Sequence, residues 1–165
     1  MGGKDKIKHV VVRLNEIKLF KMTMKDFDQM IEIYKSFWGV RGLNDPIAYQ
    51  KIIEQNLSYV YKIGNELIAF CLVEYMYEKN NIEINLLCVK EEYKGMKFGK
   101  NLLSFCINNC KKKKYKHFSL HVSTKNIPAL NLYKTLGFEI KSFIRKYYND
   151  EDPNVNDAYY MTLSV

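Results

Sequence analysis

The segment from residue 87 to residue 100 combines residue types that can hold a phosphate group. It runs from Leu87-Cys88-Val89 to Lys94-Gly95-Met96-Lys97-Phe98-Gly99-Lys100. An apolar strand here leads through a glycine-containing loop into a helix, so several backbone N–H groups point at one spot where the helix dipole favours an anion. The three lysines add positive charge, and the pattern predicts a pyrophosphate site. Many strand-to-helix turns carry a glycine, so this segment alone does not identify the ligand.

A histidine in an apolar strand is a second candidate for chemistry. His121 lies in Leu120-His121-Val122, shortly before Asn126, where a strand leads into a helix. An imidazole titrates near neutral pH and is therefore suited to proton transfer. A lone histidine in such a strand is also often structural, and the residues by themselves leave both interpretations open.

The elements that would position these groups follow the order βααβββαβαββ, which predicts a mixed α/β domain. Thr23 and Asp26 resemble a capping box before a first helix, Asp45-Pro46 opens a second, and residues 37–43 form a loop between them. Two further helices are expected at 99–109 and 126–136, the last ended by Gly137. Strands are expected at 17–21, 57–63, 66–75, 82–89, 117–122, 138–148 and 158–163.

Length and composition indicate one globular domain over residues 1–165, with 1–13 loosely ordered. The chain is 47% hydrophobic and 27% charged. No apolar stretch is long enough to span a membrane and no signal-peptide core is present, so we expect a cytoplasmic protein without a membrane partner. The four cysteines form no CxxC pair, which predicts reduced, buried thiols and no metal site.

The formal net charge of +8 comes mostly from lysine. Arg13, Arg41 and Arg145 are the only arginines among 26 cationic residues. Sequence-specific readers of nucleic acid commonly use arginine, so no specific nucleic acid is expected as a partner. The run from Lys111 to Lys114 suits a helix C-terminus, where cations complement the dipole. Contact with an acidic partner or with RNA, such as that of the ribosome, is the alternative.

A second block follows the phosphate-binding segment at a regular spacing. Its pattern, N-x-x-A-x-x-x-Y-x-x-x-G-F, is matched at Asn126, Ala129, Tyr133, Gly137 and Phe138. Together, the two blocks resemble the GCN5-related N-acetyltransferase (GNAT) superfamily. The cofactor loop of that superfamily reads Q/R-x-x-G-x-G/A. Here Lys94 replaces the Gln or Arg, and Lys97 replaces the first glycine, so a side chain must fit where the family has none.

The resemblance implies a central, mostly antiparallel sheet of about seven strands with about four helices, in which strands 82–89 and 117–122 splay around acetyl-CoA. It implies cofactor contacts from Leu87, Cys88, Val89, Lys94, Gly95, Met96, Lys97, Phe98, Gly99, Lys100, Asn126 and Tyr133. It also implies a direct attack of an amine on the thioester. Three catalytic candidates follow: His121 as base, Tyr133 as proton donor to the CoA thiolate, and Glu83, which occupies the position of a general-base Glu in histone-type members.

Within the superfamily, Leu-His-Val and the tail Arg145-Lys146-Tyr147-Tyr148 resemble NatE-type protein N-terminal acetyltransferases, although these have a Tyr at the position of Glu83. This resemblance implies a polypeptide N-terminus as substrate, Met-starting with a hydrophobic second residue, and an acetyltransferase complex or the ribosome as partner. The residues implied to bind the substrate are Phe37, Trp38, Val40, Glu83, His121, Tyr147 and Tyr148, the two tyrosines alternating on a strand. A lysine or polyamine acetyltransferase and a non-catalytic CoA- or ribosome-binding adaptor remain alternatives.

Overall fold

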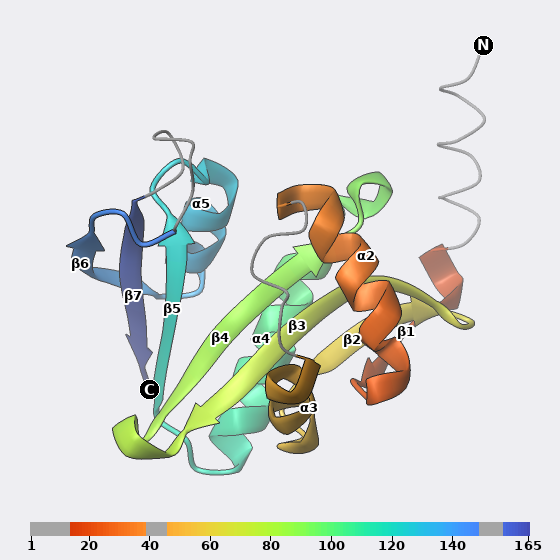
Figure 1. Ribbon diagram of the computed structural model, residues 1–165, viewed down its shortest axis with the longest axis horizontal. Coiled ribbons are helices and arrows are strands. Elements are labelled where there is room, and N and C mark those ends of the chain that lie inside the picture. The colour runs from red at the N-terminus through yellow and green to blue at the C-terminus, as the bar shows by residue number, and fades with distance from the viewer. Residues whose placement is uncertain (1–13, 39–45, 149–156) are drawn as a thin grey trace. The chain divides into compact units, whose positions relative to one another are not determined.

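A computed structural model of the protein describes residues 14–38, 46–148 and 157–165. The expected order of elements is confirmed (Figure 1). The strands are β1 (Ile17–Lys21), β2 (Tyr59–Ile63), β3 (Glu66–Met76), β4 (Asn81–Val89), β5 (His117–Ser123), β6 (Glu139–Ile144) and β7 (Ala158–Ser164). The helices are α2 (Phe27–Trp38), α3 (Pro46–Glu54), α4 (Phe98–Lys112) and α5 (Ile127–Thr135). The predictions for residues 1–13 and Val40 lie outside the described residues.

The strands form one seven-stranded sheet in the order β1-β2-β3-β4-β5-β7-β6. The pairs β1–β2, β2–β3, β5–β7 and β6–β7 are antiparallel. β4 and β5 are parallel, with Ile82–Ile84 opposite Phe118–Leu120. This is the mixed, mostly antiparallel sheet that was expected. By its internal contacts the chain forms two compact units, the first made of the chain up to Val73 with Leu86–Cys106, the second of Glu74–Asn85 with Ile107–Val165.

In the first unit, α2 and α3 pack on the β2–β3 hairpin through an apolar core. Met30 and Ile33 of α2 and Ile53 of α3 are buried in one cluster with Val60, Phe70 and other residues of the hairpin. On β3 every residue from Leu67 to Val73 is buried. Such continuous burial means that both faces of this strand are covered, and burying each large apolar side chain contributes on the order of 1.5–3 kcal/mol.

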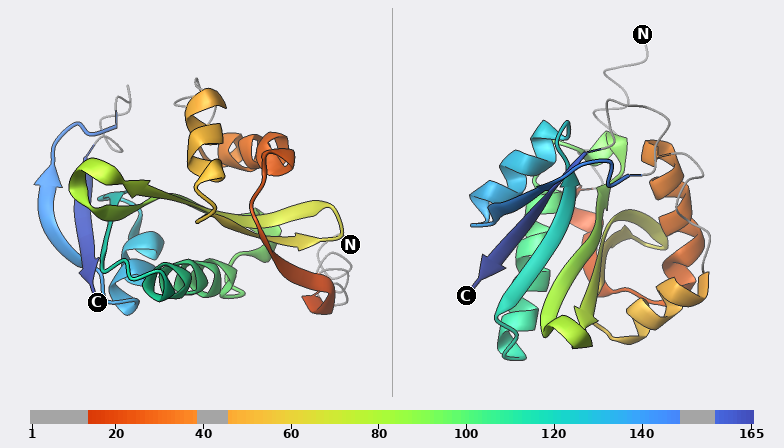
Figure 2. Two further views of the ribbon diagram at one scale, coloured as in Figure 1. Left: turned by 90° about the horizontal axis from the view of Figure 1, so that it is seen from below. Right: turned by 60° about the vertical axis from the view of Figure 1, so that its left-hand side comes forward.

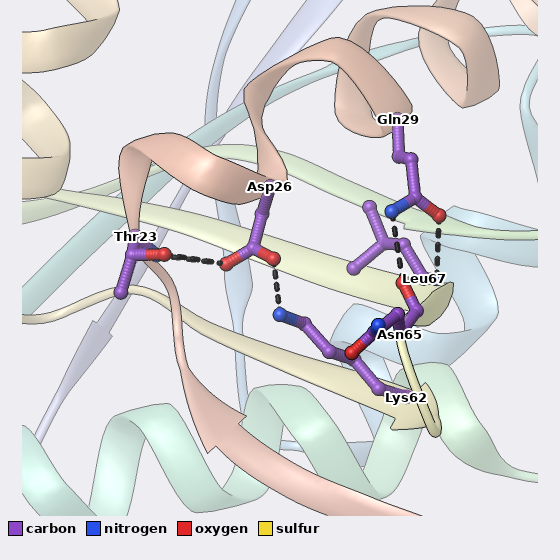
Figure 3. A network of polar contacts seen from close by, with 6 residues as sticks. All are labelled: Thr23, Asp26, Gln29, Lys62, Asn65 and Leu67. Carbon is purple, nitrogen blue, oxygen red and sulfur yellow. Dashed lines mark hydrogen bonds and ion pairs between the residues drawn. The ribbon is translucent and has the colours of Figure 1, made fainter.

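A polar network ties the start of α2 to the hairpin (Figure 3). The Thr23 N–H donates to Asp26 Oδ2 at 2.9 Å, and the Asp26 N–H donates to the Thr23 carbonyl, which confirms the capping interaction predicted from the sequence. Asp26 is buried and also forms an ion pair with Lys62. Gln29 accepts from the Leu67 N–H at 2.8 Å. These contacts fix the register between helix and hairpin.

In the second unit, β5 alternates between an apolar and a polar face. Phe118, Leu120 and Val122 are buried, whereas His117, Ser119 and His121 occupy the alternate positions. β5 and β7 lie side by side with a continuous register from His117 opposite Ser164 to Ser123 opposite Ala158 (Figure 2). The polar face of β5 is therefore where a functional group on this strand can meet side chains from the neighbouring strands.

Two of the boundaries that differ from the sequence prediction affect candidate site residues. α2 continues through Trp38, so Phe37 lies in its last turn rather than in a loop. β6 ends at Ile144, so Tyr147 and Tyr148 do not alternate on a strand as predicted. The chain turns there because Lys146 has a left-handed φ of 52° and its N–H donates to Asp157 Oδ1 at 2.8 Å.

The expectations for the cysteines and for the lysine run agree with the described part of the chain. All four cysteines are free and buried. No helix among the described residues is long and apolar enough to cross a membrane. The lysine run begins in the last turn of α4, where Lys111 and Lys112 are exposed, as the helix-dipole interpretation predicted.

Candidate active site

The predicted phosphate-binding segment is built from a short 3₁₀ turn, Glu91–Tyr93, followed by the N-terminus of α4. The first-turn N–H groups of any α-helix have no acceptor within the helix, and the first turn of α4 contains no acidic residue. Gly95 has a φ of 76° and a Cβ there would meet open space. The segment therefore fits an anionic cofactor group such as a pyrophosphate, with Lys94, Lys97 and Lys100 as the nearby cations.

Lys97 shows why the family pattern has a glycine at its position. Its φ is 65°, in the left-handed region that glycine adopts without cost. The carbonyl of Lys97 accepts the first bond of α4, from the Asn101 N–H at 2.9 Å. The backbone geometry of the loop is thus kept, and the lysine carries a conformational cost.

Lys94 is held by two neighbours in the first unit. Its ammonium lies 2.5 Å from Glu91 Oε2 and 4.2 Å from the ring centroid of Phe37. The structure thereby brings a predicted cofactor residue and a predicted substrate-wall residue into contact. Trp38 continues the same helix turn, and its side chain lies outside the described part.

Cys88 lies near the end of β4, just before the loop, and is buried. Burial raises the pKa of this thiol far above its usual value, and Lys94 lowers it by less. The group therefore stays a neutral thiol and is unsuited to act as a nucleophile. No group of three or more potential metal-ligating side chains occurs among the described residues.

In the second unit, Glu83 and His121 form a hydrogen-bonded pair across the parallel strands. Glu83 lies opposite Ser119, and His121 follows two residues further along the same face of β5. Glu83 Oε1 is 3.1 Å from His121 Nδ1, and the two side chains are only 16% and 19% exposed. Two of the three catalytic candidates are thus in direct contact.

Aromatic rings surround the His121 imidazole. Tyr147 stacks on it with ring centroids 4.5 Å apart and an interplanar angle of 9°. Tyr160, directly opposite His121 in the β5–β7 register, has its ring centroid 5.1 Å away. Tyr148 packs edge-on against Tyr147. Burial, and secondly the charge of Glu83, raises the pKa of the Tyr147 hydroxyl, so this group stays neutral.

Sequence reasoning missed Tyr160 as a site residue. The signal that could have found it is the antiparallel pairing of the last strand with strand 117–122, which places one residue of Ala158–Ser164 opposite His121. That register was not assigned from the sequence.

The third catalytic candidate, Tyr133, lies on α5 and is buried, with its ring 5.9 Å from that of Phe138. Asn126 caps this helix as predicted, because its Oδ1 accepts from the Ala129 N–H at 3.2 Å. Gly137 ends it with a φ of 91°, and the Phe138 N–H returns to the Tyr133 carbonyl at 3.1 Å. The second sequence block therefore builds the two ends of one helix and anchors Tyr133 between them.

Comparison with known proteins identifies the family. Residues 27–138 match the model of the acetyltransferase (GNAT) family, and this match covers more than half of the chain. The protein belongs to this family and is an N-acetyltransferase that uses acetyl-CoA as donor.

Individual relatives are similar over nearly their whole length. A Bacillus subtilis protein described as a candidate alanine N-acetyltransferase of ribosomal protein bS18 is 27% identical over 146 residues, covering 87% of this chain and 93% of that protein. An N-alpha-acetyltransferase of Sulfurisphaera tokodaii is 25% identical, with 91% and 94% covered. Arabidopsis thaliana Naa50, solved with the bisubstrate analogue CoA-Ac-MVNAL, shares the fold with a TM-score of 0.74 at 24% identity, with 91% and 99% covered.

Proposed function

We propose that this acetyltransferase modifies the α-amine at the N-terminus of polypeptides, with a preference for chains that begin with Met followed by a hydrophobic residue. The observation that carries the proposal is the His121 imidazole, which is bonded through Nδ1 to Glu83 and enclosed by Tyr147 and Tyr160. This arrangement provides a proton acceptor beside aromatic side chains, which suit an apolar first residue.

The acidity of the acceptor amine favours an N-terminus over a lysine side chain. An α-amine with a pKa of about 7.8 is roughly one-tenth neutral at pH 7, whereas a lysine side chain is neutral in well under ~0.1% of molecules. An imidazole is a modest base, so it is matched to the amine that loses its proton more easily. An acidic ring of residues would be needed to hold a polyamine, and the described walls of the site are mainly aromatic.

In this proposal two side chains, His121 and Tyr133, carry out the proton transfers. Acetyl-CoA supplies the acetyl group as a thioester. His121 takes the proton of the attacking α-amine at Nε2, the ring nitrogen that Glu83 does not occupy. Tyr133 Oη donates a proton to the sulfur of the CoA leaving group. Phe37, Tyr147 and Tyr148 would contact the acceptor chain, and Lys94, Lys97 and Lys100 the cofactor phosphates.

The relatives support a protein substrate. The Bacillus subtilis relative is described as a candidate alanine N-acetyltransferase of ribosomal protein bS18, and the Sulfurisphaera tokodaii relative as an N-alpha-acetyltransferase. The peptide part of the analogue bound to the Arabidopsis protein begins with Met. A fold neighbour with a TM-score of 0.75 and 22% identity was solved as part of the NatC complex with a Gag peptide and CoA. The proposal includes a subunit of an acetyltransferase complex or the ribosome as partner. The exposed lysines Lys111 and Lys112 at the end of α4 would suit an acidic surface on such a partner.

The test is release of CoA by the purified chain with acetyl-CoA and a panel of amines. The panel contains Met-Leu, Met-Ala and Ser-Glu peptides, an N-terminally acidic peptide, an internal-lysine peptide with a blocked N-terminus, and spermidine. Turnover of Met-starting peptides, lost in His121→Asn and reduced in Tyr133→Phe, is the expected result. Turnover confined to the blocked lysine peptide or spermidine would overturn the N-terminal assignment. CoA binding without turnover on any amine would make the protein an adaptor.

A further inference from the structure

Glu83 can contact His121 only because of the ladder between β4 and β5. The two residues are 38 positions apart in the chain, and the parallel register places them diagonally on the same sheet face. Their side chains are mostly buried, so water competes weakly for the hydrogen bond between them. The contact between Glu83 and His121 is therefore a direct consequence of the fold of this unit.

The chemistry of the two groups fixes which one donates. An ionised carboxylate can only accept hydrogen bonds, and a neutral imidazole carries its proton on one nitrogen alone. The bond from Nδ1 to Glu83 Oε1 at 3.1 Å therefore requires the Nδ1–H tautomer. Nε2 is then left with a free lone pair. A neutral histidine without a partner at Nδ1 favours the opposite tautomer, in which Nε2 carries the proton and cannot accept another.

The ring is also held against rotation. Tyr147 covers one face nearly in parallel, and Tyr160 contacts the ring from β7. A half-turn of the imidazole about its Cβ–Cγ bond would replace Nδ1 by a carbon facing Glu83 and would lose the hydrogen bond. The ring orientation is set by these three neighbours together.

We propose that Glu83 is a positioning residue, whose carboxylate holds His121 in the Nδ1–H tautomer so that Nε2 is the base for the acceptor amine. This assignment rests on the proposed function. When His121 Nε2 takes the proton of the amine, a positive charge forms on the imidazole beside the Glu83 carboxylate. The carboxylate stabilises this charge and does not itself accept the proton. The role differs from that of a general-base Glu, which would accept the proton of the substrate directly.

The first test measures the tautomer and does not depend on turnover. ¹⁵N spectra of the imidazoles in the full chain, assigned with His121→Asn, are compared for the unsubstituted protein, Glu83→Gln and Glu83→Leu. We expect His121 as the Nδ1–H form with Glu83, a partial shift with Gln, whose amide oxygen still accepts, and the Nε2–H form with Leu. His117, on the same strand and within 3.4 Å of Ser164 Oγ, is the internal reference and should not change. An Nε2–H form in the unsubstituted protein, or no change in Glu83→Leu, would overturn the proposal.

The second test separates positioning from direct proton transfer. Glu83→Leu is expected to lower kcat by about 10–100-fold with little change in the KM for the peptide, a loss of the size found when a carboxylate that orients a metal-ligating histidine is removed. Glu83→Gln should recover at least part of this loss. Glu139→Gln removes a charge from an exposed residue of the same unit and should leave kcat unchanged. Equal losses in Glu83→Gln and Glu83→Leu with an active His121→Asn would identify Glu83 as the base instead. If no amine is acetylated, the proposed function fails, and the tautomer experiment still decides the role of Glu83 in ordering His121.

Discussion

The ammonium group of Lys94 lies over the ring of Phe37, with 4.2 Å between Nζ and the ring centroid. Lys94 occupies the position from which the family contacts phosphate, yet its charge is already engaged by Phe37 and by Glu91. If Lys94 binds a cofactor phosphate as proposed, the phosphate must compete with the Glu91 carboxylate for this lysine.

Glu91→Gln is accordingly expected to tighten CoA binding by about 2–5-fold, because a mostly exposed ion pair contributes at most ~1 kcal/mol. Calorimetric titration with CoA at low and at high salt measures the effect, which should shrink as salt screens the charges. Glu92→Gln changes the net charge equally from the neighbouring position and serves as the control. Equal tightening in both variants would mean that only the overall charge matters.

Lys97→Gly is expected to raise the free energy of unfolding. Lys97 has a φ of 65°, and a non-glycine residue there costs on the order of 1 kcal/mol, part of which is offset by the larger chain entropy of glycine in the unfolded state. The gain should be a few tenths of a kcal/mol to ~1 kcal/mol, measured by urea unfolding without cofactor. Lys97→Ala removes the same charge but keeps the strained backbone, so a stabilisation as large as that of Gly would contradict the backbone explanation.

Gly137→Ala should destabilise the second unit. Gly137 has a φ of 91°, and a Cβ would lie 3.3 Å from Leu163 Cδ1. We expect a loss of about 1–3 kcal/mol, since backbone strain and crowding add. Gly64→Ala is the matched comparison, because Gly64 has a φ of 54° and open space around its Cβ. Thermal unfolding should show a larger decrease in melting temperature for Gly137→Ala than for Gly64→Ala. Equal decreases would show that crowding against Leu163 contributes nothing.

Tyr147→Phe should leave kcat/KM within about threefold of the unsubstituted value from pH 6 to pH 9. Burial and the charge of Glu83 raise the pKa of the Tyr147 hydroxyl, so this group stays neutral over that range and its ionisation does not enter the pH profile. Tyr147→Leu removes the stacking on His121, worth about 0.5–1.5 kcal/mol, and should lower kcat by about 3–10-fold. A loss in Tyr147→Phe as large as in Tyr147→Leu would assign the role to the hydroxyl.

The sequence was sufficient for several features that depend on residues close together in the chain. The bonds between Thr23 and Asp26, the cap at Asn126 and the turn at Gly137 are of this kind, because each involves residues within a few positions. The family resemblance added the central, mostly antiparallel sheet of about seven strands, which the structure confirms.

What could not be predicted depends on strand register and on a turn. The Glu83–His121 contact follows from the pairing of β4 with β5, and the Tyr160 contact from the pairing of β5 with β7. Neither register is encoded locally. Tyr147 reaches His121 from beyond the end of β6, after the left-handed residue Lys146, a conformation that a lysine rarely adopts.

The three-residue parallel ladder at Ile82–Ile84 makes this chemistry sensitive to misfolding. A slip of one residue between the strands would turn Glu83 and His121 to opposite faces of the sheet and would remove their contact. A chain that folds compactly with these two strands misaligned would retain its helices and still be inert. Specific activity is therefore a more stringent assay of correct folding for this protein than circular dichroism or solubility.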